Sequence, residues 1–352
     1  MSDAVVFDNV SIVFGDHPDT ALPLMDAGQD RAEIQQETGQ ILGVHDCSLS
    51  VQEGEILVLM GLSGSGKSTL LRAVNGLNPV VRGNVRVNIG DWTCDPGNCS
   101  KDDLLRLRRE CVAMVFQQFG LLPWRNVTDN VALGLELGGM SRAKREAKVK
   151  EQLELVGLSD WADSKVGELS GGMQQRVGLA RAFATEAPIL LMDEPFSALD
   201  PLIRTRLQDE LLELQAKLKR TIIFVSHDLD EAFKLGNRIA IMDGGRITQS
   251  GTPQEITANP ANAYVEDFVT HMNPLRVLQA SDVMLASADA PSTTPDNEVQ
   301  VVSDAPVADV IDALSDGADT IGVTDEDGKE IGSISSQQVV DALRSRATRD
   351  PE

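Results

Sequence analysis

Residues 61–69 read Gly-Leu-Ser-Gly-Ser-Gly-Lys-Ser-Thr. The stretch matches the pattern G-x-x-x-x-G-K-[ST], and it lies between an apolar run at 55–60 and a segment at 70–74 that can form a helix. We expect a loop whose backbone N–H groups surround a polyphosphate. The pattern predicts a set of nucleotide-binding residues: Gly61, Leu62, Ser63, Gly64, Ser65, Gly66, Lys67, Ser68 and Thr69.

Two side chains of this loop have distinct expected tasks. Lys67 supplies a point charge to the β- and γ-phosphates, and the hydroxyl of Ser68 is a ligand for Mg²⁺. A turn rich in Gly and Ser could match the pattern by accident. The apolar strand before the loop and the helix after it favour a nucleotide site instead.

The composition limits the class of protein. A length of 352 residues suggests two domains, or one large domain with an appendage. The net charge of −23 argues against a protein that binds nucleic acid without specificity, because such a protein needs a basic face. The four cysteines lack metal-ligand spacing, so we expect reduced thiols rather than a zinc site. Residues 1–4 do not resemble a signal peptide, and no apolar run approaches the ~20 residues of a membrane helix, so a cytosolic location is expected.

Strand and helix patterns alternate along most of the chain. Buried strands are predicted at 111–116, 189–194 and 221–226, with helical patterns between them. This order predicts an α/β fold with a mostly parallel sheet, and the hairpins around it predict an antiparallel edge. Between the first strand, 5–14, and the next, residues 15–39 form an insertion, in which we expect one short amphipathic helix from Leu22 to Gln35 that is ended by Gly39.

Polar side chains follow three of the buried strands. Asp193 and Glu194 close one strand, His227 follows another, and Gln117 follows the third. Because the carboxyl ends of parallel strands converge on the ligand, we expect these four residues near the phosphate loop. Asp193 would hold Mg²⁺, Glu194 would act as general base on the attacking water, and His227 and Gln117 would contact the γ-phosphate, the water or the metal.

A second anion site is predicted at Ser170, Gly171 and Gly172, where a serine and two glycines begin a helix. The site lies in the helical insertion between Gln117 and Asp193. One chain could hardly fold it back over its own phosphate loop, whereas a partner related by two-fold symmetry could present it. The sequence therefore indicates a homodimer with two ATP sites at one interface.

With these motifs in order, the chain resembles the ATPase subunits of ABC transporters. The resemblance covers about residues 5–269 and includes Walker A at 61–69, the Q-loop Gln117, the signature at 169–174, Walker B at 189–193 followed by Glu194, the D-loop at 197–200 and the switch His227. It implies a P-loop NTPase fold with a parallel sheet core, an antiparallel β edge and a helical signature subdomain at 118–180. It also implies a nucleotide contact for the D-loop Asp200 and an aromatic side chain stacked on adenine, for which Phe14 is the candidate; packing in the core is the alternative for Phe14.

Several details resemble the branch that imports glycine betaine, proline betaine or choline. They include His17 and Pro18 in the insertion and the stretches at 198–204, 226–232 and 259–262. The resemblance implies an ATP- and Mg²⁺-dependent subunit at the cytoplasmic face of the inner membrane, bound to integral permease subunits and served by an extracytoplasmic substrate-binding protein. The dock for the permease would lie near Gln117 to Trp124. An importer for another amine or an amino acid is the nearest alternative, and a soluble ABC ATPase that acts on ribosomes or DNA is the alternative of another class.

The C-terminal part differs in composition. Sixteen Asp and Glu residues stand against four Lys and Arg residues from Gln279 to Glu352. We expect an ATPase domain at 1–279, a linker at 280–306 rich in Ala, Ser, Pro and Asp, and an ordered segment at 307–352. The order of helix, strand, turn, strand and helix in that segment resembles a single degenerate CBS motif, which implies a small α+β appendage with a regulatory or dimer-stabilising role.

Overall fold

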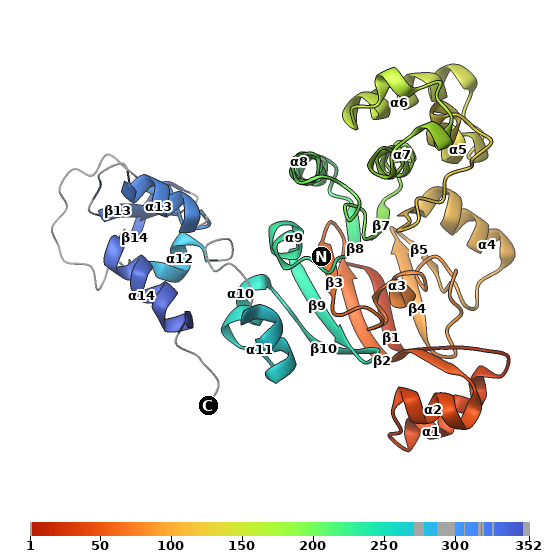
Figure 1. Ribbon diagram of the computed structural model, residues 1–352, viewed down its shortest axis with the longest axis horizontal. Helices are drawn as coiled ribbons and strands as arrows, with labels where there is room; N and C mark the ends of the chain where they lie inside the picture. The colour runs from red at the N-terminus through yellow and green to blue at the C-terminus, as the bar shows by residue number, and fades with distance from the viewer. Residues whose placement is uncertain are drawn as a thin grey trace. The chain divides into compact units, whose positions relative to one another are not determined.

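The computed structural model describes residues 2–270, 278–286, 300–305, 307–315, 318, 320–325 and 327–347. The chain divides into two compact units, Met1–Thr252 and Pro253–Glu352 (Figure 1). The first unit ends before the boundary at 279 that composition suggested, because α10 (Pro253–Ala258) and α11 (Ala263–Thr270) belong to the second.

A six-stranded sheet with the order β10-β9-β3-β8-β7-β6 forms the centre of the first unit. Its strands from β9 to β6 run parallel, and β10 pairs antiparallel with β9 at one edge. The central strands are buried along their whole length, as the apolar runs predicted. The strands are β3 (Ile56–Met60), β6 (Val112–Val115), β7 (Ile189–Asp193), β8 (Thr221–Val225), β9 (Arg238–Asp243) and β10 (Arg246–Gly251).

A second, antiparallel sheet has the order β2-β1-β4-β5. It consists of β1 (Asp3–Phe14), β2 (Ile41–Gln52), β4 (Arg82–Ile89) and β5 (Trp92–Cys94). These strands therefore form a sheet of their own, and only the β9–β10 hairpin lies at the edge of the parallel sheet. The α/β class with a parallel core and antiparallel strands is confirmed.

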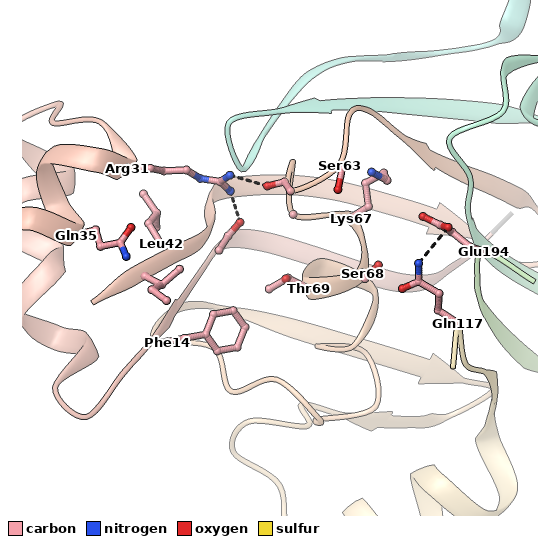
Figure 2. A pocket seen from close by; sticks show the side chains of 14 residues that line it. Phe14, Arg31, Gln35, Leu42, Ser63, Lys67, Ser68, Thr69, Gln117 and Glu194 are labelled. Carbon is pink, nitrogen blue, oxygen red and sulfur yellow. Dashed lines mark hydrogen bonds between the residues drawn. The ribbon is translucent and has the colours of Figure 1, made fainter. Parts of the chain in front are cut away.

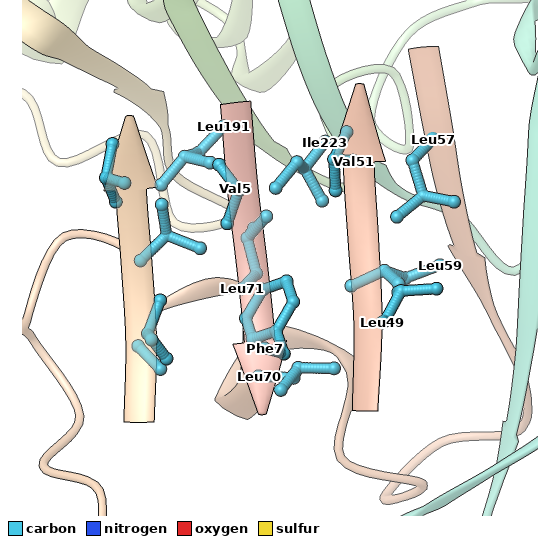
Figure 3. Close-up of a cluster of buried hydrophobic side chains, with 14 of the residues drawn as sticks. Val5, Phe7, Leu49, Val51, Leu57, Leu59, Leu70, Leu71, Leu191 and Ile223 are labelled. Atoms are coloured by element: carbon cyan, nitrogen blue, oxygen red, sulfur yellow. The ribbon is translucent and has the colours of Figure 1, made fainter. Parts of the chain in front are cut away.

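The main hydrophobic core joins the two sheets. The antiparallel sheet contributes four side chains that face β3 (Figure 3): Val5, Phe7, Leu49 and Val51. The same cluster contains Leu57 and Leu59 of β3 together with Leu70, Leu71, Leu191 and Ile223. Each such fully buried side chain contributes about 1.5–3 kcal/mol relative to an exposed position. This packing fixes α3 (Lys67–Leu71), and therefore the phosphate loop, against both sheets.

Three helices form a group beside the parallel sheet: α5 (Val127–Leu137), α6 (Arg142–Leu155) and α7 (Gly171–Ala184) (Figure 1). Within the helical pattern predicted between the strands at 111–116 and 189–194, Gly138 and Gly139 separate α5 from α6. Further elements of this unit are α4 (Lys101–Arg106), α8 (Pro201–Leu218) and α9 (Leu229–Leu235).

The insertion contains two helices rather than the single one expected from 22 to 35. A 3-10 turn (Pro18–Ala21) leads into α1 (Leu22–Asp26), and α2 (Arg31–Thr38) follows. Gly28 has φ +79°, which ends the first helix, and Asp30 begins the second with a capping box. Gly39 ends α2 in the left-handed conformation, as predicted.

The second unit contains a separate four-stranded sheet with the order β11-β14-β13-β12. Its elements are α12 (Ala280–Val283), β11 (Leu285–Ala286), β12 (Gln300–Val302), α13 (Val307–Ser315), β13 (Thr320–Thr324), β14 (Glu330–Ser335) and α14 (Ser336–Ala347). The predicted order of helix, strand, turn, strand and helix is present. However, β11 and β12 come from the range assigned to the linker, of which 287–299 lie outside the described residues.

Candidate functional site

The phosphate loop joins the central strand β3 to α3. Its glycines are required by close contacts: a Cβ at Gly61 would lie 2.1 Å from the carbonyl oxygen of Met242, and one at Gly66 would lie 2.6 Å from that of Gly43. Both residues also have positive φ, +140° and +103°. The predicted strand, loop and helix are therefore found in the order that a phosphate-binding loop needs.

Lys67 is held inside this loop. Its side chain is 6 % exposed, and Nζ donates hydrogen bonds of 2.8 Å to the carbonyl oxygens of Gly61 and Leu62. Burial lowers the pKa of Lys67, while the nearby carboxylates of Glu194 and Asp193 oppose that shift. A buried cation whose partners are neutral carbonyls fits an anionic group at the mouth of the loop.

Ser68 and Asp193 meet between α3 and the end of β7. The Ser68 hydroxyl donates a hydrogen bond of 2.6 Å to Oδ1 of Asp193, whose side chain has no solvent exposure. Arg72, one turn after Ser68, forms an ion pair of 2.7 Å with the other carboxylate oxygen. The hydroxyl and the carboxylate form an oxygen donor set of the kind that binds Mg²⁺, and Arg72 orients it. We did not predict the role of Arg72, although its spacing of i+4 from Ser68 was a signal.

Glu194 lies close to two other predicted residues, Gln117 and His227. Its Oε2 accepts a hydrogen bond of 3.2 Å from Nε2 of Gln117 and is 3.4 Å from Nδ1 of His227. Glu194 has φ +48°, a conformation uncommon for a residue with a side chain. The backbone is held there by Gln175, whose Nε2 donates to the carbonyl oxygen of Glu194 over 3.0 Å.

Gln175 was missed by the sequence analysis. It is 1 % exposed, and its Oε1 also accepts a hydrogen bond of 3.0 Å from the backbone N–H of Ala198. A single buried amide therefore connects α7 to both Glu194 and the segment before Asp200. Its position two residues after the Ser170–Met173 stretch gave no indication of this contact from sequence alone.

A cavity of about 450 Å³ extends from Glu194 along the loop to Phe14 (Figure 2). Gln117 and Glu194 lie at one end and Phe14, Gln35 and Leu42 at the other. The phosphate loop lines the middle of the cavity, between these two ends. The cavity can therefore hold an elongated ligand whose polar part contacts the loop. Its lining is Phe14, Arg31, Gln35, Ile41, Leu42, Gly43, Ser63, Gly64, Gly66, Lys67, Ser68, Thr69, Gln117 and Glu194.

Phe14 ends β1 at the edge of this cavity and is 36 % exposed, so it is not a core residue. A Cβ at Gly43 would lie 2.8 Å from the Phe14 ring, so a side chain at 43 would displace the ring. The exposed ring leaves a flat apolar surface at the cavity end away from Glu194. This geometry fits the predicted stacking partner for a base.

Ser170, Gly171, Gly172 and Asp200 do not line this cavity. Ser170 begins α7, and its Oγ accepts a hydrogen bond of 3.3 Å from the backbone N–H of Met173. Asp200 begins α8 in the same manner, over 3.1 Å to Ile203. Ser170, Gly171 and Asp200 are exposed, so each is open to a second molecule.

A second hollow of about 370 Å³ lies between the segment 108–116, which includes β6, and the helices α5 and α7. Its apolar part includes Leu77, Met114, Phe116, Leu133 and Leu137, and it is also lined by the exposed Arg108 and Arg109 and by the buried Arg181. We call it the apolar groove. Phe116 and Gly120 connect it to the segment 117–124 that we expected to contact a permease. Among the described helices, none is long and apolar enough to cross a membrane.

Comparison with known families and proteins places these features in context. A family model described as "ABC transporter" matches residues 44–197. The glycine betaine/proline betaine transport system ATP-binding protein ProV of Escherichia coli is 50 % identical over 275 residues, which cover 78 % of this chain and 68 % of that protein. The trimethylamine N-oxide transport system ATP-binding protein TmoW of Ruegeria pomeroyi is 44 % identical over 340 residues, 95 % of each chain.

Among solved structures, the chain is similar to an ATP-binding cassette described as a dimer in a post-hydrolysis state bound to ADP and Pi. The TM-score is 0.60 at 31 % sequence identity, and the match covers 70 % of this chain and 98 % of that one.

Proposed function

Since the chain belongs to the ATP-binding subunits of ABC transporters, and is therefore an ATPase, we propose that it drives an importer for small quaternary ammonium compounds. The observation that carries the cargo class is the identity of 48–50 % to subunits named for glycine betaine, proline betaine and carnitine transport. Glycine betaine, proline betaine and choline are the proposed cargoes. The relatives are transport subunits, which disfavours the alternative of a soluble ATPase acting on ribosomes or DNA.

Trimethylamine N-oxide is a second candidate cargo. The subunits named for its transport match 95 % and 98 % of this chain, at 44 % and 40 % identity, and so include the C-terminal unit. The ATPase subunit does not contact the cargo in either case. The cargo would instead be selected by a substrate-binding protein and by the permease.

The nucleotide site supports a division of tasks among the chain's own residues. Bound ATP with Mg²⁺ supplies the phosphoanhydride whose cleavage drives transport. The loop at 61–69 would hold the phosphates, with the buried cation of Lys67 against them. Ser68 and Asp193, already 2.6 Å apart, would hold the metal, with Gln117 as a further ligand from the other side.

Glu194 would act as the general base. Its carboxylate is 18 % exposed, so it is accessible to one water and is held between Gln117 and His227. His227, on the other side of Glu194, would hold the water and the terminal phosphate in line. Gln117 follows β6 and His227 follows β8, so residues from two different strands would contact the same phosphate.

The ATP site would be completed by a second copy of the chain. Ser170, Gly171 and Gly172 do not reach the cavity of their own chain, and a similar cassette is described as dimeric. In a two-fold dimer each signature would face the partner's phosphate loop, and Asp200 would lie beside it. Closure of the two chains would then move the permease subunits at the apolar groove, at the cytoplasmic face of the membrane.

The test is reconstitution with permease subunits and a binding protein in lipid vesicles. ATP hydrolysis is measured with glycine betaine, proline betaine, choline, trimethylamine N-oxide and an unrelated amino acid. We expect stimulation by a quaternary ammonium compound, and none in the Lys67→Ala variant. Stimulation by trimethylamine N-oxide alone would select the second cargo, and stimulation by the amino acid alone would contradict the proposed cargo class.

A further inference from the structure

Helix α2 of the insertion contributes two side chains to the nucleotide cavity. Arg31 and Gln35 both line it together with the phosphate loop (Figure 2). They are spaced i, i+4 and therefore lie on one face of α2. Neither belongs to the motifs that the sequence analysis assigned to ATP.

The position of α2 is fixed by local and tertiary contacts. Asp30 accepts a hydrogen bond of 2.8 Å from the backbone N–H of Glu33, and the Glu33 side chain accepts one of 2.8 Å from Asp30. Ile34 is fully buried and packs into a small cluster with Val13 and Leu42. The helix therefore presents the same face to the cavity in a defined orientation.

Arg31 connects α2 directly to the phosphate loop. Its Nη1 donates a hydrogen bond of 2.7 Å to the carbonyl oxygen of Gly64, and its Nη2 donates one to that of Gly43. Gly64 belongs to the loop itself, and Gly43 lies on β2 close to the ring of Phe14. One guanidinium thus joins the insertion both to the phosphate loop and to the strand beside Phe14.

Gln35 lies at the other end of the cavity. Figure 2 shows Gln35, Leu42 and Phe14 together at the end opposite Glu194 and Gln117. With phosphates at the loop and the terminal phosphate toward Glu194, this end receives the base. Gln35 is exposed, and within the part of the chain that the structure describes its side-chain amide has no hydrogen-bond partner.

We propose that Gln35 reads the nucleobase and makes the site selective for adenine over guanine, with Arg31 as the positioning residue that holds α2 in place. The amide of Gln offers one acceptor and one donor side by side, which match the N6 amino group and N7 of adenine. At the same edge guanine presents two acceptors, O6 and N7, so the Gln35 carbonyl loses its partner. This inference rests on the proposed ATPase site.

The experiment measures binding of AMP-PNP and GMP-PNP, which are not hydrolysed, to the full chain by titration calorimetry. For Gln35→Ala we expect affinity for the adenine nucleotide to fall about five- to tenfold, with little change for the guanine nucleotide. Gln36→Ala is the matched control, because Gln36 is exposed on the same helix and does not line the cavity. It should leave both affinities unchanged.

Two further variants separate base reading from a general structural effect. Gln35→Glu replaces the donor by a second acceptor, so the carboxylate can still accept from the N6 amino group of adenine but can no longer donate to N7. We expect the preference for the adenine nucleotide to be weaker than in the wild-type chain and not to reverse. Arg31→Ala should lose the preference by freeing α2, and Arg31→Lys, which can keep one bond to a carbonyl, should retain part of it.

The outcomes distinguish base reading by Gln35 from the proposed ATP site on which it rests. Equal loss for both nucleotides in Gln35→Ala, or equal affinity of the wild-type chain for both, overturns base reading by Gln35. Failure of the wild-type chain to bind either nucleotide contradicts the proposed ATP site itself. A preference that is lost in Gln35→Ala, is kept in Gln36→Ala and is weakened in Gln35→Glu supports the inference.

Discussion

The hydroxyl oxygen of Ser68 lies 2.6 Å from Oδ1 of Asp193, although the two residues are 125 positions apart in the chain. The bond joins the start of α3 to the end of β7 across the intervening strand β8. Both atoms are oxygens of the kind that a hard cation prefers, so we propose that the pair holds Mg²⁺ after only small movements of the two side chains.

The first prediction concerns this pair. Asp193→Asn should remove most of the gain in ATP affinity that Mg²⁺ gives, because it deletes a charged ligand while Ser68 stays in place. Binding is measured with Mg²⁺ and with EDTA. Asp209→Asn is the control, since Asp209 pairs with Lys234 on the surface, 2.7 Å away. A variant at Asp193 with the full Mg²⁺ effect would contradict the metal assignment.

The second prediction concerns Glu194. Glu194→Gln keeps the shape of the side chain and can still bond to Gln117, but an amide cannot accept the proton of the attacking water. We expect hydrolysis to fall at least about a hundredfold, with ATP affinity kept within about threefold. Phosphate release and equilibrium binding test the two halves separately. An active variant would reject Glu194 as the base, and Glu213→Gln on α8 serves as the control.

The third prediction concerns pH and His45. This residue is 8 % exposed, and its Nε2 is 2.9 Å from Nη2 of Arg246. Burial, aided by the charge of Arg246, lowers the pKa of His45 below its ordinary value of 6.5, so the folded chain keeps the ring neutral. As the pH falls from 6.5 to that lowered pKa, the unfolded chain takes up a proton that the folded chain does not. The free energy of unfolding therefore decreases in this window, by at most about 1.4 kcal/mol per pH unit.

Chemical denaturation between pH 8 and pH 5.5 measures this effect. His45→Gln keeps an acceptor for Arg246 but does not titrate, so its stability should change less with pH than that of the wild-type chain. An identical pH dependence in the two proteins would show that His45 is not responsible.

The fourth prediction concerns the apolar groove. Leu137 is 56 % exposed at the end of α5 and lines the groove. Leu137→Glu should leave the ATPase activity of the isolated chain unchanged and should reduce the stimulation by permease subunits at least about fivefold, because a charge cannot be buried in an apolar contact. Leu218→Glu, at an exposed site on α8 outside the groove, is the control. Equal stimulation of all three proteins would place the permease contact elsewhere.

The sequence predicted the residues whose chemistry is local to a strand end. Asp193, Glu194 and Gln117 follow buried strands, and parallel pairing alone brings them to one edge. Arg31 and Gln35 could not be found in this way. Their approach to the cavity depends on the burial of Ile34 and on the hydrogen bonds of Arg31 to the carbonyl oxygens of Gly43 and Gly64, contacts between segments apart in the chain.

The structure of the insertion at 15–39 could be predicted in part from the sequence. Gly28 and the pair Asp30 and Glu33 signal a break and a new capping box, yet the apolar spacing from Leu22 to Gln35 suggested one helix. The segment assigned to the linker at 280–306 contains a strand near its end. Gln300–Val302 has only two β-branched residues, too few to signal a strand by themselves, and it forms a strand because β13 pairs with it.

The central claim is that one ATP site is formed by two chains. Its most direct test is the molar mass of Glu194→Gln in solution, measured by light scattering with and without ATP, beside Glu194→Gln combined with Ser170→Arg. We predict a monomer without nucleotide, a dimer with ATP, and a monomer that still binds ATP in the doubly substituted chain. A Glu194→Gln chain that binds ATP at saturation and remains a monomer would contradict the claim.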